Sequence, residues 1–424
     1  MLKPKSNAIR VVEATLGKIT EVKKPVSKFI IHIVELWLAM NCRYVFSNMG
    51  RWGRMNEKSY RNCFKKFFDW FGFNYNMVKQ HCGKEIIVVF DPSYIKKSGK
   101  QTYGMGMFWS GVRQKALKGL EIGCLAFVDV AAGTAMHGVA EQTPSPKSLK
   151  AEGKTLVTHY VSLLKKHLTD IKAITTYLAV DGYFMKKEFI APLLKEGLHI
   201  ITKSRSDANL KYLFKGKQKA GRGRKKVYDG KINTSQIDKR RLPCCYADED
   251  MKVYAGKVYC VLLKHIVLAA FIYYGDKEKP EIIIGTDTAM EVMRMCKYYG
   301  LRFQVEFLIR DAKQFTGLQD CMARDERKLH THFNIAMTVV SVAKGAYYLS
   351  VPKEQRGSFS MADIKMLHMN QLITKRIFSN LALDLSCRKI KRIYNECLNF
   401  GRIRPLKLTG VLILAEKINL KEEE

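Results

Sequence analysis

Two short apolar runs in the middle of the chain are its clearest signals of regular structure. Residues 85–91 (EIIVVFD) and residues 175–181 (TTYLAVD) are rich in β-branched and aromatic side chains, and each run ends in an aspartate. Uninterrupted apolar runs of this length are typical of strands that are buried on both faces of a sheet. We therefore predict two buried strands that end at Asp91 and Asp181.

The segments around these two strands predict a mixed α/β domain. Residues 102–114 and 119–130 have the pattern of extended segments, and with the first run they would form a three-stranded antiparallel meander. Residues 150–168 and 184–195 have helical character, and residues 199–203 (HIITK) are a further strand candidate. An order of strand, meander, helix, strand, helix and strand is that of a sheet with helices packed on it.

The N-terminal region is predicted to be helical. Pro25 begins a helix that runs to about Met40, and a glycine-containing loop at residues 47–54 leads to a second, basic helix capped by Asn56. Two helices across a short turn fit a helix-turn-helix reader of DNA, and an all-helical bundle with a solvated basic face fits equally well. The aromatic side chains of the second helix that we expect to point inward are Tyr60, Phe64, Phe67, Phe68 and Phe71.

A β-rich insertion is predicted to interrupt the α/β domain. It opens with a basic, glycine-containing run at residues 215–226 (KGKQKAGRGRKK), which disfavours regular structure, and it continues with strand-like segments. The organisation that we predict is a helical DNA-binding region (1–84), an α/β domain in two parts (85–206 and 281–350), the β-rich insertion (207–280) and a helical C-terminal region (351–424).

Residues 297–313 (KYYGLRFQVEFLIRDAK) carry the most informative arrangement of charge. At 100° per residue, Arg302, Glu306 and Lys313 fall on one face of a helix, so that an acid lies between two bases. The opposite face is aliphatic and would be buried. A solvated amphipathic helix with paired charges is the alternative interpretation of this stretch.

The charge of the whole chain favours a polyanionic partner. Its 424 residues, enough for two to four domains, include 73 Lys and Arg against 39 Asp and Glu, which gives a net charge of +34. Basic side chains gain affinity for nucleic acid by displacing the counterions condensed on phosphates. A hydrophobic content of 47% is that of a globular protein.

The same sequence argues against a membrane protein and against a disulfide framework. Residues 29–40 are too short an apolar run to span a bilayer, and the run at 258–274 contains Lys264 and His265. The first ten residues lack the apolar core of a signal peptide. Eleven cysteines, an odd number without a CxxC pair, suit reduced thiols in a cytoplasm.

The acids at the strand ends suggest metal-dependent chemistry. If their strands are neighbours, Asp91 and Asp181 lie side by side at one edge of the sheet, and a helix could present Glu306 to the same point. Three oxygen donors suit Mg²⁺ or Mn²⁺, and a pair of such ions can clamp both oxygens of a reacting phosphodiester. For either aspartate alone, an ordinary turn residue is the alternative.

The spacing of Tyr299, Arg302, Glu306 and Lys313 is Y-x(2)-R-x(3)-E-x(6)-K. It resembles the signature of DDE transposases of bacterial insertion sequences, in the insertion-sequence-four group. The order strand–Asp, meander, strand–Asp, insertion and helix–Glu is similar to the ribonuclease H-like fold as these transposases carry it. The resemblance covers about residues 85–350.

This resemblance implies an enzyme and assigns its catalytic residues. Asp91, Asp181 and Glu306 would hold a pair of Mg²⁺ ions, with Mn²⁺ as a substitute. The enzyme would cut DNA at the ends of an insertion sequence and join the freed 3′ ends to target DNA. There are two alternatives. One is another nuclease or integrase of the same fold, and the other is a domesticated DNA-binding protein without catalysis.

The resemblance also assigns partners. Arg302 and Lys313 would bind phosphates near the cut, and Tyr299 would contact the same backbone. Lys203 and Arg205, just past a predicted strand, are further candidate phosphate contacts, although ordinary surface charge explains them equally well. The expected partner is double-stranded DNA, bound by a homodimer at the nucleoid of a bacterial cytoplasm, with no membrane involved.

Overall fold

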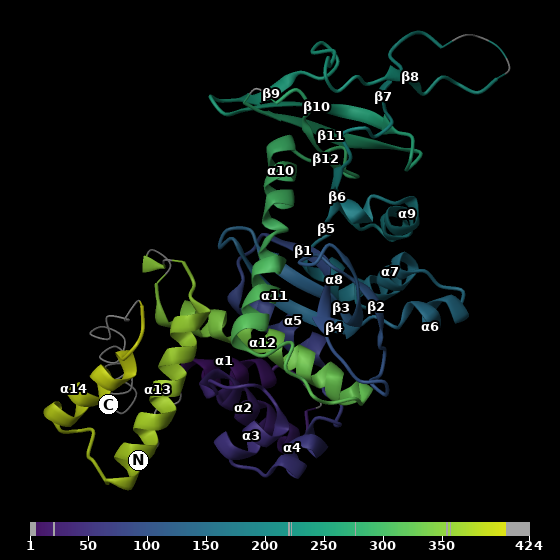
Figure 1. The fold of residues 1–424 in the computed structure, drawn as a ribbon. Coiled ribbons are helices and arrows are strands. Elements are labelled where there is room, and N and C mark those ends of the chain that lie inside the picture. Colours follow the sequence, from purple (N-terminus) through teal and green to yellow (C-terminus); the bar gives the residue numbers. More distant parts are fainter. Residues whose placement is uncertain are drawn as a thin grey trace.

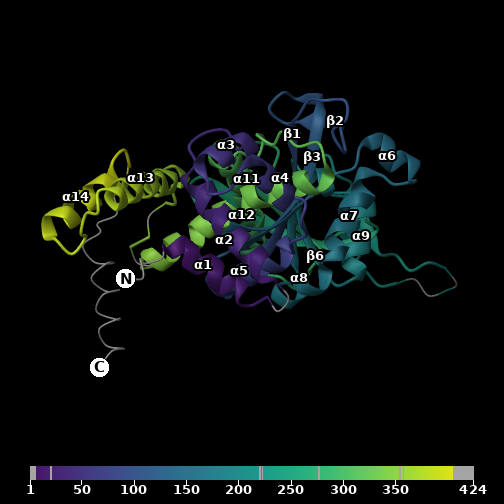
Figure 2. The same ribbon diagram turned by 90° about the horizontal axis from the view of Figure 1, so that it is seen from below.

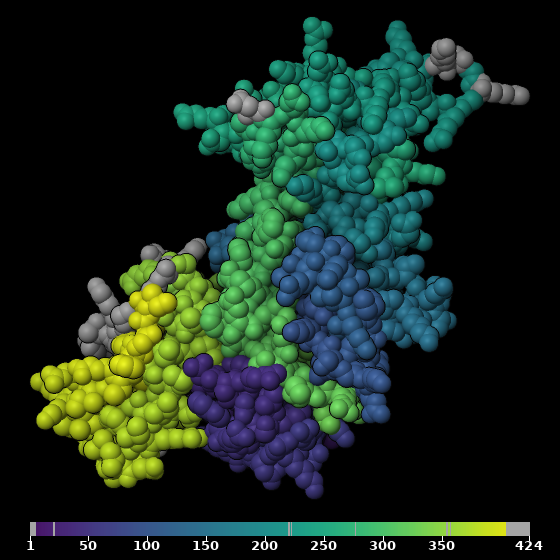
Figure 3. Space-filling view, viewed as in Figure 1, coloured from purple at the N-terminus to yellow at the C-terminus, as the bar shows by residue number. Residues whose placement is uncertain are grey.

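The computed structural model describes residues 6–19, 22–218, 221, 223–275, 277–352, 355–356 and 358–403. One mixed sheet of twelve strands runs through the molecule, and helices cover both faces of its central part (Figure 1). The residues of the insertion (teal) lie at one end of the molecule, and the N-terminal (purple) and C-terminal (yellow) residues lie at the other (Figure 3).

Five strands make the centre of the sheet, in the order β4-β3-β1-β5-β6. β3 pairs antiparallel with β1 and with β4, whereas β5 runs parallel to β1 and β6 runs parallel to β5. β1 and β5 are buried because helices cover both of their faces, as their apolar sequences predicted. The bounds are Ile86–Lys96 (β1), Lys115–Asp129 (β3), Thr134–Gln142 (β4), Tyr177–Val180 (β5) and His199–Ser204 (β6).

Seven further strands extend the sheet in both directions. β2 (Gly106–Ser110) pairs with the start of β3 and forms one edge. On the other side β6 pairs antiparallel with β12, and the sheet continues through β11, β10, β7 and β8, with β9 on β10. The bounds are Leu210–Leu213 (β7), Tyr228–Lys231 (β8), Cys244–Ala247 (β9), Met251–Cys260 (β10), His265–Tyr274 (β11) and Glu281–Gly285 (β12).

Helices cover the central strands on two sides. α5, α11 and α12 contact one side of the sheet through β1, β3 and β4, while α7 contacts β3 and α9 contacts β6. α10 contacts β5, β6, β11 and β12. The bounds are Trp70–His81 (α5), Pro146–Ala151 (α6), Leu156–Lys166 (α7), Leu168–Ile174 (α8), Gly182–Phe184 (η1), Lys187–Lys195 (α9), Val292–Leu301 (α10), Gln304–Phe315 (α11) and Glu326–Ser350 (α12).

The long helix α12 lies at the centre of the molecule and is buried along most of its length. The sheet covers it on one side, and α1 (Asn7–Leu16) and α2 (Lys24–Ala39) cover it on the other. α13 (Met361–Asn380) packs on α2, and α13 and α14 (Arg388–Asn399) extend away from the sheet (Figures 1 and 2). The last part of the predicted C-terminal region, residues 404–424, lies outside the described residues.

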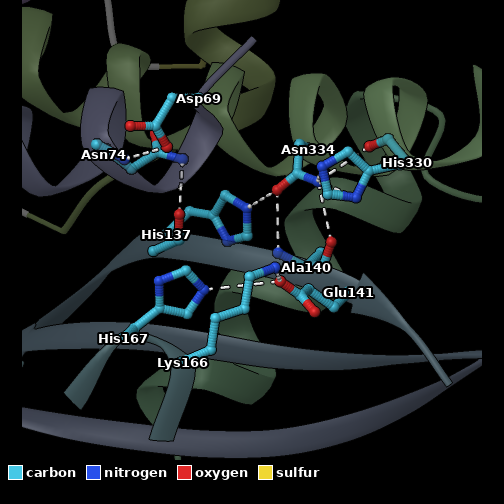
Figure 4. A network of polar contacts seen from close by, with 11 residues as sticks. Asp69, Asn74, His137, Ala140, Glu141, Lys166, His167, His330 and Asn334 are labelled. Atoms are coloured by element: carbon cyan, nitrogen blue, oxygen red, sulfur yellow. Dashed lines mark hydrogen bonds and ion pairs between the residues drawn. The ribbon is translucent and has the colours of Figure 1, made fainter. Parts of the chain in front are cut away.

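Hydrogen bonds between α12 and β4 fix the helix on the sheet (Figure 4). The side-chain amide of Asn334 accepts a hydrogen bond from the Ala140 N–H and donates one to the Ala140 carbonyl, both at 2.9 Å. His137 Nε2 lies 3.1 Å from the same amide oxygen. A buried asparagine thus satisfies backbone groups that water cannot reach.

A bulge in β4 lies beside this network and leaves a further backbone group to be satisfied. The register against β3 shifts so that Leu125 pairs with Val139 but Ala126 pairs with His137, and Gly138 is the extra residue. The unpaired Gly138 carbonyl accepts a hydrogen bond from Asn74 Nδ2 of α5 at 2.9 Å. Side chains of the covering helices therefore replace the ladder bonds that the bulge removes.

The strand that carries Asp91 is longer than its apolar run predicted. β1 continues past Asp91 to Lys96, and Asp91 lies in mid-strand opposite Cys124 of β3. The neighbour on the other side, β5, ends at Val180. Pro92 therefore lies at an edge of the ladder, where the missing N–H of a proline is tolerated.

The N-terminal helices differ from the prediction in two places. The predicted loop at residues 47–54 is mostly helix α3 (Phe46–Trp52), and the basic helix capped by Asn56 is the short α4 (Glu57–Cys63). Phe67, expected to point inward, is 87% exposed. The continuous basic helix on which the helix-turn-helix interpretation rested is therefore not formed.

The first half of the α/β segment also differs in detail. The predicted helix at 150–168 is interrupted at Gly153, whose φ of +65° favours glycine, and Thr155 caps the helix that follows. In the structure, β1, β3 and β4 form the three-stranded antiparallel unit, and β4 was not predicted. All eleven cysteines are free thiols, and no helix among the described residues could cross a membrane.

We expect Asn334→Leu to lower the free energy of unfolding by about 3 kcal/mol, because it leaves the buried N–H and carbonyl of Ala140 without partners. Chemical denaturation measures the loss. Asn48→Leu is the control, since the Asn48 amide donates only to the Arg43 carbonyl at the surface, and it should change stability by less than about 0.5 kcal/mol. Equal effects of the two changes would contradict the role given to Asn334.

Candidate active site

Adjacent parallel strands place two aspartates next to each other. Phe90 of β1 lies opposite Val180 of β5, and Asp91 and Asp181 are the residues that follow them. Asp181 leaves the strand at this point, and its carbonyl accepts a hydrogen bond from Thr202 Oγ1 of β6 at 2.9 Å. As whole residues, Asp91 and Asp181 are both half-buried.

Glu306 approaches the same strands from helix α11. The helix buries Val305, Leu308 and Ala312 and contacts β1 and β3, as its aliphatic face predicted. Glu306 lies in the first turn of α11 and is exposed. Its carboxylate forms an ion pair with Arg302, with Nη1 and Oε1 2.9 Å apart.

The helix predicted across residues 297–313 is in fact two helices. α10 ends just before Arg302, where the Arg302 N–H donates to the Tyr299 carbonyl at 3.1 Å, and α11 begins at Gln304. Gly300 has a low helix propensity and lies beside the break. At the break Arg302 turns inward and is only 4% exposed. The prediction had placed its side chain on an exposed polar face.

Four charged side chains act on Asp91. Burial raises the pKa of its carboxyl from an ordinary 3.8 to about 7. The positive charges of Arg302 and Lys313 lower this pKa, and the negative charges of Glu306 and Asp181 raise it. The structure thus brings together the three acids and two of the bases that the sequence singled out.

Lys313 is held against the strand that carries Asp91. Its Nζ donates to Ser93 Oγ at 2.9 Å, and Ser93 lies two residues after Asp91 on the same face of β1. Burial lowers the pKa of Lys313, while the negative charge of Asp91 raises it. The sequence analysis missed Ser93, although the period of two along a strand places residue 93 on the Asp91 face.

Tyr299 lies in the interior beside Arg302 instead of on the surface. The Arg302 guanidinium lies 5.8 Å from the centre of the Tyr299 ring and 4.4 Å from that of Phe303. Burial raises the pKa of Tyr299 to about 12, so its hydroxyl stays protonated. In this arrangement Tyr299 supports Arg302 and does not itself face solvent.

Lys203 and Arg205 have acidic partners of their own. Lys203, on β6, pairs with Glu281 of β12 at 2.9 Å, and Arg205, in the loop that follows, pairs with Asp207 at 2.9 Å. Neither is among the groups that shift the pKa of Asp91. The structure therefore does not bring these two bases into the cluster, and their phosphate contacts stay a prediction.

The chemistry of the three acids fits a divalent cation. In the part of the chain that the structure describes, no three His, Cys, Asp or Glu side chains stand in position to hold a metal ion. However, the Asp91 carboxylate is desolvated and repelled by two other carboxylates, a condition that a hard cation with oxygen ligands relieves. Glu306 would have to turn from Arg302 to join it.

Comparison with protein families finds a match in the second half of the α/β region. Residues 152–341 match the family described as Transposase DDE domain. The matched segment contains Asp181, Glu306 and Lys313, and it begins after Asp91. A search of curated proteins finds no match. The family match supports a DDE transposase.

We expect the repelled carboxylate of Asp91 to lower stability at neutral pH. Its folded pKa of about 7 lies above its ordinary 3.8, so the free energy of unfolding falls as the pH rises between these values. Without divalent ions, Asp91→Asn should raise the melting temperature at pH 8, by an amount equivalent to about 2 kcal/mol, and the gain should vanish near pH 4.

Differential scanning calorimetry across this pH range measures the effect. Asp250→Asn, which removes the same charge from an exposed site on the insertion, is the control. Millimolar Mg²⁺ at pH 8 should raise the melting temperature of the wild type more than that of Asp91→Asn. A gain for Asp91→Asn that does not depend on pH would contradict the assignment.

Proposed function

We propose that this chain is a transposase that cuts DNA at the ends of an insertion sequence and joins the 3′ ends to target DNA. The observation that carries the proposal is the cluster around Asp91, in which Asp181 and Glu306 supply two further acids and Arg302 and Lys313 supply two bases. The transposase match of residues 152–341 is independent support. The Y-R-E-K spacing favours the insertion-sequence-four group.

We infer a ribonuclease H-like fold for the catalytic part. The strand order β4-β3-β1-β5-β6, with β3 antiparallel and β5 parallel to β1, supports it. The strands from β7 to β11 enter between β6 and β12, at the place where a β-rich insertion was predicted. In such α/β sheets ligands bind beyond the carboxyl ends of parallel strands, where Asp181 lies.

Asp91, Asp181 and Glu306 would hold the Mg²⁺ or Mn²⁺ ions. When bound, such ions lower the pKa of an attacking water or hydroxyl and stabilise the charge on the phosphodiester. The rest of the work belongs to the chain itself. Lys313, fixed by Ser93, offers its ammonium group to a phosphate beside Asp91.

Arg302 has two competing partners in this mechanism. Before DNA binds, its guanidinium pairs with Glu306 at 2.9 Å. A phosphate that takes over the guanidinium as a bidentate ligand would release the Glu306 carboxylate toward the two aspartates. Tyr299 would keep the Arg302 guanidinium in place during this exchange. DNA binding and completion of the acid cluster are therefore coupled in our proposal.

The proposed partner is double-stranded DNA, both the terminal repeats of the element and the target. The net charge of +34 supports a polyanion. Two ends must be cut and joined together, so we expect a homodimer on DNA, acting at the nucleoid of a bacterial cytoplasm.

One observation favours a second candidate, a DNA-binding protein that keeps the fold without catalysis. Glu306 is paired with Arg302, and no described group of three ligands is arranged for a metal ion. A supercoiled plasmid that carries the inverted repeats flanking the gene separates the candidates. Metal-dependent nicking at these repeats supports the transposase, nicking without end preference supports a general nuclease, and binding without nicking supports the second candidate.

We expect Glu306→Gln to abolish nicking of the repeat plasmid in Mg²⁺ while its affinity for the repeat DNA stays within about twofold, because the change removes a charge but little volume. Glu249→Gln, at an exposed site on the insertion, is the matched control and should nick normally. Nicking by Glu306→Gln at the wild-type rate would show that Glu306 is not a metal ligand.

We expect Lys313→Ala and Arg302→Ala each to reduce the dependence of DNA affinity on salt. Each phosphate contact contributes about 0.9 to the slope of log K against log [salt]. Fluorescence anisotropy with a labelled repeat duplex at several salt concentrations measures the slope, and the melting temperature of each variant shows whether it is folded. Slopes equal to the wild type in folded variants would exclude these two phosphate contacts.

A further inference from the structure

A β-hairpin at the edge of the sheet has no role in the function proposed above. It consists of β2 and the first five residues of β3, joined by a turn at residues 111–114. β2 lies at the outer rim of the molecule (Figure 2). We call residues 106–119 the edge hairpin.

The two faces of the edge hairpin differ. Phe108 and Ser110 are buried and fasten one face to the protein. Met107 and Trp109 alternate with them on the other face and are 55% and 59% exposed. Val112, in the turn, is 93% exposed. Three large apolar side chains thus stand in solvent on a strand that is anchored from behind, which is uncommon for an isolated soluble surface.

Basic side chains surround these apolar residues. Residues 92–120 contain six Lys and Arg and no Asp or Glu. Lys118 lies directly opposite Met107 and shares its exposed face, whereas Lys115 lies opposite Ser110, on the other face at the turn end of the hairpin. Within the described residues, Lys97 donates to the Cys321 carbonyl, and no acid pairs with the other five, which are Lys96, Lys100, Arg113, Lys115 and Lys118.

The edge hairpin is held in one conformation. Tyr94 of β1 donates its hydroxyl hydrogen to the Lys118 carbonyl at 2.8 Å. In the turn, the Arg113 N–H donates to the Ser110 carbonyl at 3.2 Å, and the Gln114 side chain donates to the Gly111 carbonyl at 2.6 Å. A partner would therefore meet a surface that loses little conformational freedom on binding.

We propose that the edge hairpin is a second contact surface for duplex DNA, separate from the acid cluster. Its cations would contact phosphates on both sides of a groove. Trp109 and Met107 would insert against a base-pair step, as apolar wedges do in proteins that bend DNA. This inference rests on the proposed function only for the choice of DNA as partner.

Charge decides between DNA and a second copy of the chain. In a symmetric dimer through this edge, each hairpin would face its own copy, and its three cations, Arg113, Lys115 and Lys118, would meet three others. Such like-charge contacts are unfavourable across an interface. Duplex DNA supplies both the anions and the apolar base surfaces that the edge hairpin lacks.

The position of the edge hairpin fits a duplex that also reaches the acids. β1 carries Asp91 and runs on to Lys96, which pairs with Gly119 at the base of the hairpin. Five residues of strand span about 16 Å. This distance is about five base pairs of B-DNA at 3.4 Å each. One bound duplex would therefore contact both places.

The fluorescence of Trp109 can report DNA binding at the edge hairpin. Of the four tryptophans, Trp37 and Trp70 are buried and Trp52 is half-buried, so Trp109 is the exposed one. The difference between the fluorescence of the wild type and that of Trp109→Phe isolates its emission. We would titrate both proteins with a blunt 20-base-pair duplex of unrelated sequence, in EDTA, so that neither element ends nor cleavage is involved.

We expect saturating duplex to quench the Trp109 emission at least twofold and to shield it from acrylamide. The double change Met107→Ala with Trp109→Ala should weaken binding about tenfold, on the scale of one lost stacking contact, without changing the salt slope. Arg113→Ala with Lys115→Ala should reduce the salt slope by about two. Leu381→Ala, at a similarly exposed apolar residue that caps the C-terminus of α13, should leave affinity unchanged.

Two results would overturn the inference. One is full binding of the duplex without any change in Trp109 emission. The other is quenching that follows protein concentration in the absence of DNA, which would make the edge hairpin a contact between copies. The outcome is separate from that of the proposed function. Quenching without plasmid nicking would support the DNA contact of the edge hairpin but not the transposase. Nicking without quenching would support the transposase and contradict only the DNA contact of the edge hairpin.

Discussion

The parallel pairing of β1 with β5 is the constraint on which the rest of the candidate site depends. The register that sets Phe90 beside Val180 leaves Asp91 and Asp181 as neighbours, and a shift by one residue would turn one carboxylate to the opposite face of the sheet. Apolar burial along both strands fixes this register. The same burial strips water from Asp91, so the force that positions the acids also makes their charge costly. The positive charges of Arg302 and Lys313 offset part of this cost.

The helices that cover the sheet keep the second half of the site in place. α11 is held on β1 and β3 by its aliphatic face, and α12 packs behind it on β4. Asn74 satisfies the carbonyl of the bulge residue Gly138, and Asn334 satisfies both backbone groups of Ala140 two residues further along β4. Because these amides are buried, they hold α5 and α12 in one position on β4, and α12 in turn packs against α11, the helix that carries Glu306. The position of the acids therefore depends partly on the buried hydrogen bonds of Asn74 and Asn334.

The sequence predicted those features that follow from local pattern. The apolar runs before Asp91 and Asp181, the aliphatic face of α11 and the strands of the insertion are visible because each is a periodicity or a run. Features that depend on contacts between distant parts of the sequence were not predicted. The continuation of β1 beyond Asp91 is set by β3, which lies some thirty residues away along the chain. The inward turn of Arg302 follows from a helix break that a 100° periodicity cannot show, and the contact of Lys313 with Ser93 joins residues 220 positions apart.

The sheet has a mechanical consequence because it is continuous. The strands of residues 207–280 are joined to the centre by the β6–β12 ladder, in which Ile201 lies opposite Gly285 and Thr202 opposite Ile284. Thr202 is also the residue whose hydroxyl holds the Asp181 carbonyl. A load on the far strands would therefore travel through the backbone ladder to the turn that bears Asp181. The outer strands are therefore mechanically coupled to the acids through the sheet and are not joined to them by a flexible linker.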